Sequence, residues 1–146
     1  MIEIRMLLRV TEMSGLAIIM FSGQAENFIP LAVLTQTAVN MNIPVRIFVT
    51  GTALPYFTKN KPEPRFSKEF EDMVPALMGG MKKLQMPSWY EILKEAKELG
   101  DVKIYACSLM AEVMGLKKEH LDEIVDDIVG AAFFMKESEN MKIIFI

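Results

Sequence analysis

EILKEAKELGDVKIYACSLMAEVMGL, residues 91–116, decides the fold class of this chain of 146 residues. Its first part carries apolar side chains at helical spacing and predicts a helix over residues 88–100, which Ser88 caps and Gly100 ends. The next part, VKIYA (residues 102–106), is a short apolar run typical of a buried parallel strand. SLMAEVM then predicts a second helix directly after the strand. A strand between two helices indicates a parallel sheet with helices packed on it.

The rest of the chain repeats this alternation. Four more apolar runs with turn residues beside them predict strands at residues 16–21, 45–50, 123–129 and 142–146. Helical spacing predicts helices over residues 25–42 and 131–138. The order of these elements predicts an α/β fold with βαβ units and right-handed crossovers.

Residues 51–87 are the least regular part. Residues 58–70 are charged and proline-rich, so we expect a mobile surface loop that acts as a lid or docking site. Residues 70–87 predict a helix that Pro75 breaks and that turns a corner at Gly79 and Gly80. We expect one domain over residues 1–146, with residues 1–13 as an arm that serves assembly.

Composition excludes several classes of protein. Hydrophobic residues make up 51% of the chain, which predicts a folded domain with apolar surface to spare and therefore self-association. A net charge of -3 without a basic stripe argues against nucleic acid as a partner. No apolar run is long enough to span a bilayer and the N-terminus does not resemble a secretory signal, so we expect a cytoplasmic protein.

Metal and nucleotide sites are not expected either. The chain has one cysteine and one histidine, too few for an intramolecular disulfide or a common zinc site. SGQAEN, residues 22–27, lacks the glycine pattern of a dinucleotide site and the Lys-Ser/Thr of a P-loop. We therefore expect no cofactor and no metal.

The candidate site lies where the predicted parallel strands end, because ligand crevices form at that edge of a sheet. Cys107 ends one strand, and the helix after it offers unpaired backbone N–H groups, those of Ser108 and Leu109, which favour a thiolate. Small residues follow two other strands and let the backbone approach a ligand: Ser22, Gly23, Thr50 and Gly51. The Gly-Gly pair of the irregular part, Gly79 and Gly80, is a further candidate for this crevice. Gly79 and Gly80 either line the crevice or turn the chain.

These residues leave the role of Cys107 open. A lone cysteine on a buried strand commonly has only a packing role. The position of Cys107 at the edge where ligands bind favours a reactive thiol. His120 lies among charged neighbours, so we interpret it as solvated rather than as a catalytic base. Without a base, hydrolysis by a Cys-His pair is not supported, whereas sulfur chemistry needs less machinery.

Several motifs together resemble the DsrE/DsrF/DsrH-like family, also labelled predicted peroxiredoxins. They run from about residue 16 to 146, and the most specific block extends from AKELG through ACS to MGLKKEHL, residues 96–121. The resemblance implies a three-layer α/β/α sandwich around a five-stranded, mostly parallel sheet, assembled as trimers or hexamers. It also implies a role in sulfur trafficking, in which Cys107 carries persulfide or thiosulfonate sulfur and exchanges it with TusA-like carriers or rhodaneses. A second cysteine found in some subgroups is missing here, which argues against an intramolecular resolving step.

Three hypotheses follow. The first is a sulfur carrier or sulfurtransferase that uses Cys107. The second is a thiol peroxidase or redox sensor, which would form a sulfenic acid with peroxide. The third is a non-enzymatic oligomeric binding module in which Cys107 is inert.

Overall fold

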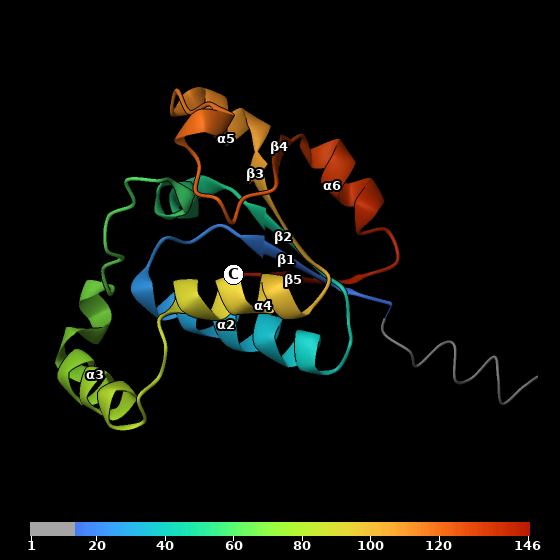
Figure 1. Cartoon of the computed structure of the whole chain (residues 1–146). Coiled ribbons are helices and arrows are strands. Elements are labelled where there is room, and N and C mark those ends of the chain that lie inside the picture. Colours follow the sequence, from blue (N-terminus) through green and yellow to red (C-terminus); the bar gives the residue numbers. More distant parts are fainter. Residues whose placement is uncertain (1–13) are drawn as a thin grey trace, which may run out of the picture.

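Five parallel strands form a single sheet in the computed structural model, which describes residues 14–146. The strand order is β4-β3-β2-β1-β5, and each neighbouring pair is parallel (Figure 1). The strands are β1 (Leu16–Met20), β2 (Val45–Val49), β3 (Val102–Cys107), β4 (Asp127–Val129) and β5 (Lys142–Phe145). The α/β class is thereby confirmed, and the predicted assembly arm, residues 1–13, lies outside the described residues.

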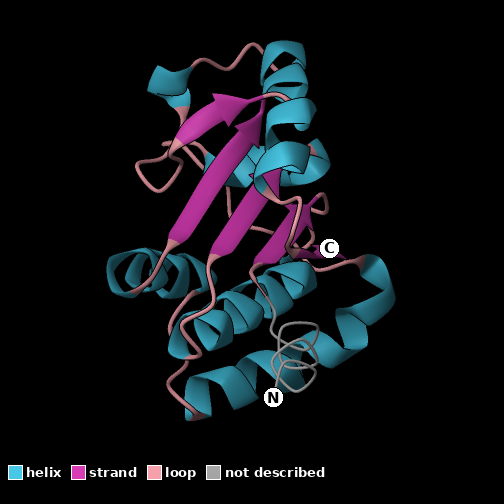
Figure 2. Cartoon of the chain, turned by 90° about the vertical axis from the view of Figure 1, so that its right-hand side faces the viewer, coloured by secondary structure: helices cyan, strands magenta, loops and turns pink. Residues whose placement is uncertain are grey.

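Helices cover both faces of this sheet, so the fold has the three layers that the resemblance implies. They are α2 (Ala25–Asn40), α3 (Val74–Lys83), α4 (Trp89–Leu99), α5 (Ser108–Val113) and α6 (Ala131–Glu137), with 3-10 segments Gly51–Phe57, Lys68–Met73 and Lys118–His120. Side by side, α2 and α4 pack on one face, here called the α4 face, and α6 packs on the other, the α6 face (Figures 1 and 2).

Alternation along each strand decides which side chains lie on which face. In β3, Ile104 and Ala106 join the large apolar core of the α4 face. Tyr105 and Cys107 point the other way and join a smaller cluster on the α6 face, with Phe134 of α6. Successive residues of a strand point to opposite faces, so Cys107 lies on the side of the sheet that has the smaller apolar cluster among residues 14–146.

The helix predicted over residues 88–100 forms for the expected reason. The Ser88 hydroxyl accepts a hydrogen bond from the Glu91 backbone N–H at 3.2 Å, and the Glu91 carboxylate accepts one from the Ser88 N–H at 2.9 Å. This capping box satisfies N–H groups that have no partner within the helix. Ile92, Leu93 and Ala96 then bury the apolar stripe of α4 against the core.

The strand predicted over residues 123–129 is wrong in extent, because β4 contains only residues 127–129. Residues 121–125 are largely buried without ladder pairing. Two aspartate side chains accept hydrogen bonds from backbone N–H groups here. Asp122 accepts one from the Ile124 N–H at 3.0 Å, and Asp126 accepts one from the Ile104 N–H at 2.8 Å. Aspartate side chains compete for backbone donors in this way, and the strand begins only after them.

The break and the corner predicted within residues 70–87 are also wrong in position. Pro75 lies in the first turn of α3, where its missing N–H has no intrahelical partner to lose, and the helix continues through Gly79 and Gly80 to Lys83. The chain turns after the helix instead, at Gln85, whose φ is 53°.

The segment of residues 58–67 has no helix or strand, which agrees with the predicted surface loop. Isolated bridges from Thr58 to Leu121 and from Arg65 to Gln24 hold it against the molecule. Its mobility and its role as a lid remain predictions.

Candidate functional site

Cys107 is the last residue of β3 and the N-cap of α5. Its exposed fraction is 8%, and it packs in the small cluster of the α6 face beside Phe48, Tyr105 and Val129. The cysteine therefore lies at the predicted edge of the sheet, where it is held among apolar side chains. Little of the residue is open to solvent.

The register of the sheet identifies the neighbours of Cys107 along this edge. Val129 of β4 is its partner on one side. On the other side, Val49 of β2 pairs with Ala106, so the next residue, Thr50, lies beside Cys107. Met20 of β1 pairs with Val49, so Phe21 lies beside Thr50. Cys107 and Val129 lie in the cluster of the α6 face, and alternation continued past the ends of β1 and β2 assigns Phe21 and Thr50 to the same row.

Most of the predicted site residues gather at this edge. Ser22 and Gly23 follow β1, Thr50 and Gly51 follow β2, and Ser108 and Leu109 begin α5 directly after Cys107. Gly79 and Gly80 do not belong to this group, since they lie within α3, at the opposite end of the molecule from α5 (Figure 1). The edge thus contains six of the eight residues predicted to accompany the thiol.

The two glycines at the edge have a packing role. A Cβ at Gly23 would lie 2.3 Å from the carbonyl oxygen of Thr52, and Gly51 has a φ of 55° with the Phe21 ring against it. A side chain at Gly23 would require backbone movement, and one at Gly51 would meet the Phe21 ring in a left-handed conformation that favours glycine. These glycines therefore bring the loops after β1 and β2 close together.

A tyrosine near the thiol is held in its neutral form. The Tyr105 hydroxyl donates a hydrogen bond to Glu137 at 2.7 Å, and Arg46 pairs with the same carboxylate oxygen at 2.7 Å. Burial and the hydrogen bond to Glu137 raise the pKa of Tyr105 above its usual value. Tyr105 is therefore not a base at neutral pH, and its network ties α6 to the sheet.

His120 lies on an exposed 3-10 segment and accepts a hydrogen bond from the Lys117 N–H at 2.9 Å. This agrees with its interpretation as a solvated histidine. Within residues 14–146, no three histidine, cysteine or acidic side chains gather closely enough to hold a metal ion. No helix of that range has the length and apolar character needed to cross a membrane.

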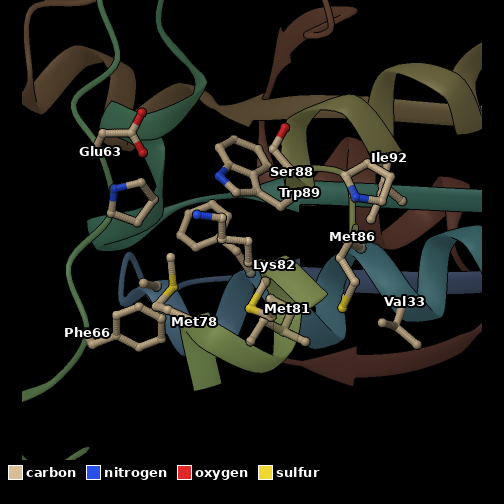
Figure 3. Close-up of a pocket in the computed structure, with 16 residues that line it drawn as sticks. Val33, Glu63, Phe66, Met78, Met81, Lys82, Met86, Ser88, Trp89 and Ile92 are labelled. Atoms are coloured by element: carbon tan, nitrogen blue, oxygen red, sulfur yellow. The ribbon is translucent and has the colours of Figure 1, made fainter. Parts of the chain in front are cut away.

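A second concave site was missed by sequence reasoning. A pocket of about 510 Å³ lies between α3, the start of α4 and the outer side of α2, and none of the predicted site residues lines it (Figure 3). Met78 and Met81 of α3 line this pocket, and Met78 is half exposed. Only their recurrence at residues 78 and 81, before Met86 and Trp89, could have indicated a shared apolar surface.

The structure is therefore a parallel α/β sheet whose only described cysteine lies at the carboxyl end of an inner strand, β3. A sequence profile described as the DsrE/DsrF/DrsH-like family matches residues 55–146, and the chain belongs to that family. Comparison with curated proteins found no match.

Solved structures show the same fold at low sequence identity. The crystal structure of the ychN protein from E. coli is 15% identical, with a TM-score of 0.60 over 92% of this chain and 100% of that one. A protein of unknown function, MTH1491 from Methanobacterium thermoautotrophicum, is 15% identical, with a TM-score of 0.50 over 90% of this chain and 99% of its own. At this identity the likeness concerns the fold alone.

Proposed function

We propose that this protein is a sulfur carrier in which Cys107 takes up sulfane sulfur or thiosulfonate and passes it to a partner thiol. The observation that carries the proposal is the position of the only cysteine of the chain at the carboxyl end of an inner parallel strand. Membership of the DsrE/DsrF/DrsH-like family, which is associated with sulfur relay, supports it.

With a persulfide donor, the proposed transfer consists of two displacements. The Cys107 thiolate attacks the outer sulfur of the donor, a new S–S bond forms on Cys107, and the donor thiolate leaves as its own S–S bond breaks. A partner thiolate then attacks the outer sulfur and Cys107 leaves as the thiolate. One sulfur atom has moved between thiols, and no external oxidant or reductant is consumed.

The surrounding edge supplies the proposed environment. The backbone N–H groups of Ser108 and Leu109 would stabilise the thiolate and the persulfide charge. Ser22, Gly23, Thr50 and Gly51 would form the approach. Since Cys107 is only 8% exposed, the donor must present its sulfur on a narrow, protruding group.

Assembly is part of the proposal. The α6 face is apolar and exposed beside β1 and β5, at Phe21, Ile143 and Phe145, here called the open strip. Such a surface is typical of a contact between protein subunits. We place a trimer or hexamer contact on it, with a TusA-like carrier or a rhodanese as the exchange partner of Cys107.

Intact-mass spectrometry after brief exposure to polysulfide, tetrathionate or a persulfide donor tests the proposal. We expect one adduct of sulfur or thiosulfonate mass that a carrier thiol removes. Cys107→Ser should give none. The double variant Cys107→Ser/Ser108→Cys moves the thiol by one residue to an exposed position and is the matched control for an ordinary surface thiol.

A wild-type adduct that forms or transfers no faster than that of the relocated thiol would contradict a dedicated site. The burial of Cys107 specifically favours the alternative of an inert cysteine in a binding module. That alternative predicts a thiol that resists alkylation in the native protein and reacts only on unfolding.

A further inference from the structure

The pocket beside α3, here called the α3 pocket, has the size of a small-molecule site. Its volume of about 510 Å³ lies within the range of about 300–1,000 Å³ found for ligand pockets. Three stretches of the chain enclose it: residues 25–33 of α2, residues 63–66 of the loop before Lys68–Met73, and residues 78–92, which run from α3 into α4 (Figure 3).

The walls of the α3 pocket are suited to an apolar body. Phe28, Phe66 and Trp89 contribute aromatic rings from the three segments, and Met78 contributes a thioether that adapts to irregular shapes. The Phe28 and Trp89 rings lie 4.5 Å apart between centroids, so they form one continuous aromatic wall. A rigid aromatic wall opposite a flexible methionine side chain suits the apolar part of a ligand, either a ring or an acyl chain.

One cation enters this apolar space. Lys82 lines the pocket, and its side chain reaches towards the Trp89 indole (Figure 3). Glu63 is the only carboxylate in the lining, and the ion pairs within 4.0 Å found for residues 14–146 do not include Lys82. An ammonium group beside an apolar wall, with no ion-pair partner among residues 14–146, complements an anionic group on the ligand.

The helix that carries Lys82 is weakly anchored. None of the residues of α3 is buried, and its ten residues are fewer than an isolated helix needs to be stable in water. Gly79 and Gly80 lie inside it, although a Cβ at either would meet no atom within 4 Å. Glycine costs a helix interior about 0.5–1 kcal/mol relative to alanine, so these glycines weaken α3 without a packing reason. A helix of such low intrinsic stability is stabilised most by contacts with a ligand that binds beneath it.

We propose that the α3 pocket binds a small molecule with an apolar body and a single carboxylate, which pairs with Lys82 and orders α3 over the ligand. This site goes beyond the sulfur chemistry proposed for Cys107 and does not depend on it, because Cys107 does not line the pocket.

Trp89 provides the readout, because it is the only tryptophan of the chain and forms part of the pocket wall. Its fluorescence is followed while the protein is titrated with decanoate, decanol or decylamine, each below the concentration at which it aggregates. We expect saturable binding of decanoate, at least tenfold tighter than that of decanol, and no measurable binding of decylamine. A charge-assisted hydrogen bond of the usual strength corresponds to about a tenfold difference or more.

Two substitutions locate the site. Lys82→Gln should weaken decanoate binding about tenfold, whereas Lys83→Gln, on the same helix but outside the lining, should leave it unchanged. Val33→Phe fills the pocket at a residue that is 43% exposed, and should abolish binding of all apolar titrants.

Equal affinity for decanoate and decanol, or equal effects of the Lys82 and Lys83 variants, would overturn the proposal. The proposal would also be overturned if decanoate does not bind and Val33→Phe sediments differently from wild type. In that case a second copy of the chain occupies the pocket. The Cys107→Ser variant should bind decanoate as wild type does, so failure of the sulfur proposal is recognised separately.

Discussion

Asp122 is the residue that connects the irregular part of the chain to the regular part. Its side chain is 8% exposed, pairs with Lys61 at 2.5 Å and accepts a hydrogen bond from the Tyr90 hydroxyl at 2.9 Å. Lys61 also lies 4.4 Å from the centre of the Tyr90 ring. The loop of residues 58–67, α4 and the segment before β4 therefore meet at one carboxylate.

The protonation of this cluster follows from its contacts. Burial raises the pKa of Asp122, but hydrogen bonds from Lys61, the Ile124 N–H and Tyr90 lower it, and the net pKa is below its usual value. Burial and the hydrogen bond to Asp122 raise the pKa of Tyr90 to about 12. At neutral pH Asp122 is therefore a carboxylate and Tyr90 a neutral phenol.

Asp122→Asn should reduce the free energy of unfolding by about 2 kcal/mol at pH 7, because hydrogen bonds to a charged group are lost. The pKa of Asp122 is lower in the folded state, so its contribution is present above the unfolded value of about 3.9 and is lost as the pH falls through the folded value. Urea unfolding at pH 7 and at pH 3 measures this. A difference between variant and wild type that stays constant or grows at pH 3 would contradict the assignment.

At the scale of elements, glycines distinguish tight contacts from open ones. Gly23 follows β1, where the Thr52 carbonyl leaves no room for a side chain. Gly79 lies inside α3 with open space around it. The same residue type thus permits a close approach in one element and weakens a helix in the other.

Gly23→Ala and Gly79→Ala should therefore have opposite effects. The first should destabilise the protein by about 1–3 kcal/mol, because the backbone must move to admit the methyl group. The second should stabilise α3 by about 0.5–1 kcal/mol, which slows amide hydrogen exchange of residues 74–83 several-fold. Urea unfolding measures the first effect and hydrogen exchange the second. Faster exchange of α3 in Gly79→Ala would show that Gly79 has a packing role.

On the scale of the whole molecule, coverage of the sheet is unequal. The α4 face is covered by α2 and α4 and holds the main core. The α6 face has α6 as its helical cover among residues 14–146, and the open strip lies on this face and shares Phe21 with the row that contains Cys107. Phe21 and Phe145 of the strip stack with ring centroids 5.9 Å apart, although both remain exposed.

If the open strip is the contact between subunits, Phe145→Lys should convert the assembly into smaller species, because a buried unpaired charge in a subunit contact costs several kcal/mol. Sedimentation velocity measures the change. Met41→Lys, at a residue that is 61% exposed at the end of α2, is the matched control and should leave the assembly intact. A wild-type monomer at micromolar concentration, or equal behaviour of the two variants, would refute this assembly.

Local patterns predicted much of the fold because they depend on neighbours in the chain. The capping box at Ser88 and Glu91 formed as expected, since its partners are three residues apart. The predicted strands at residues 16–21, 45–50, 102–106 and 142–146 correspond to β1, β2, β3 and β5. The strand at residues 123–129 was predicted too long because Asp122 and Asp126 find partners in distant elements, which no local pattern contains.

The sequence by itself determined the α/β class, the order of its elements and the place of Cys107 at the end of a strand, because spacing and capping are properties of adjacent residues. Only the tertiary structure decided that Cys107 is 8% exposed, that Gly79 and Gly80 lie away from it, and that three separate stretches of the chain enclose the α3 pocket. Burial and cavities arise from the packing of elements against one another, and that packing is set by the whole fold rather than by any segment of the chain.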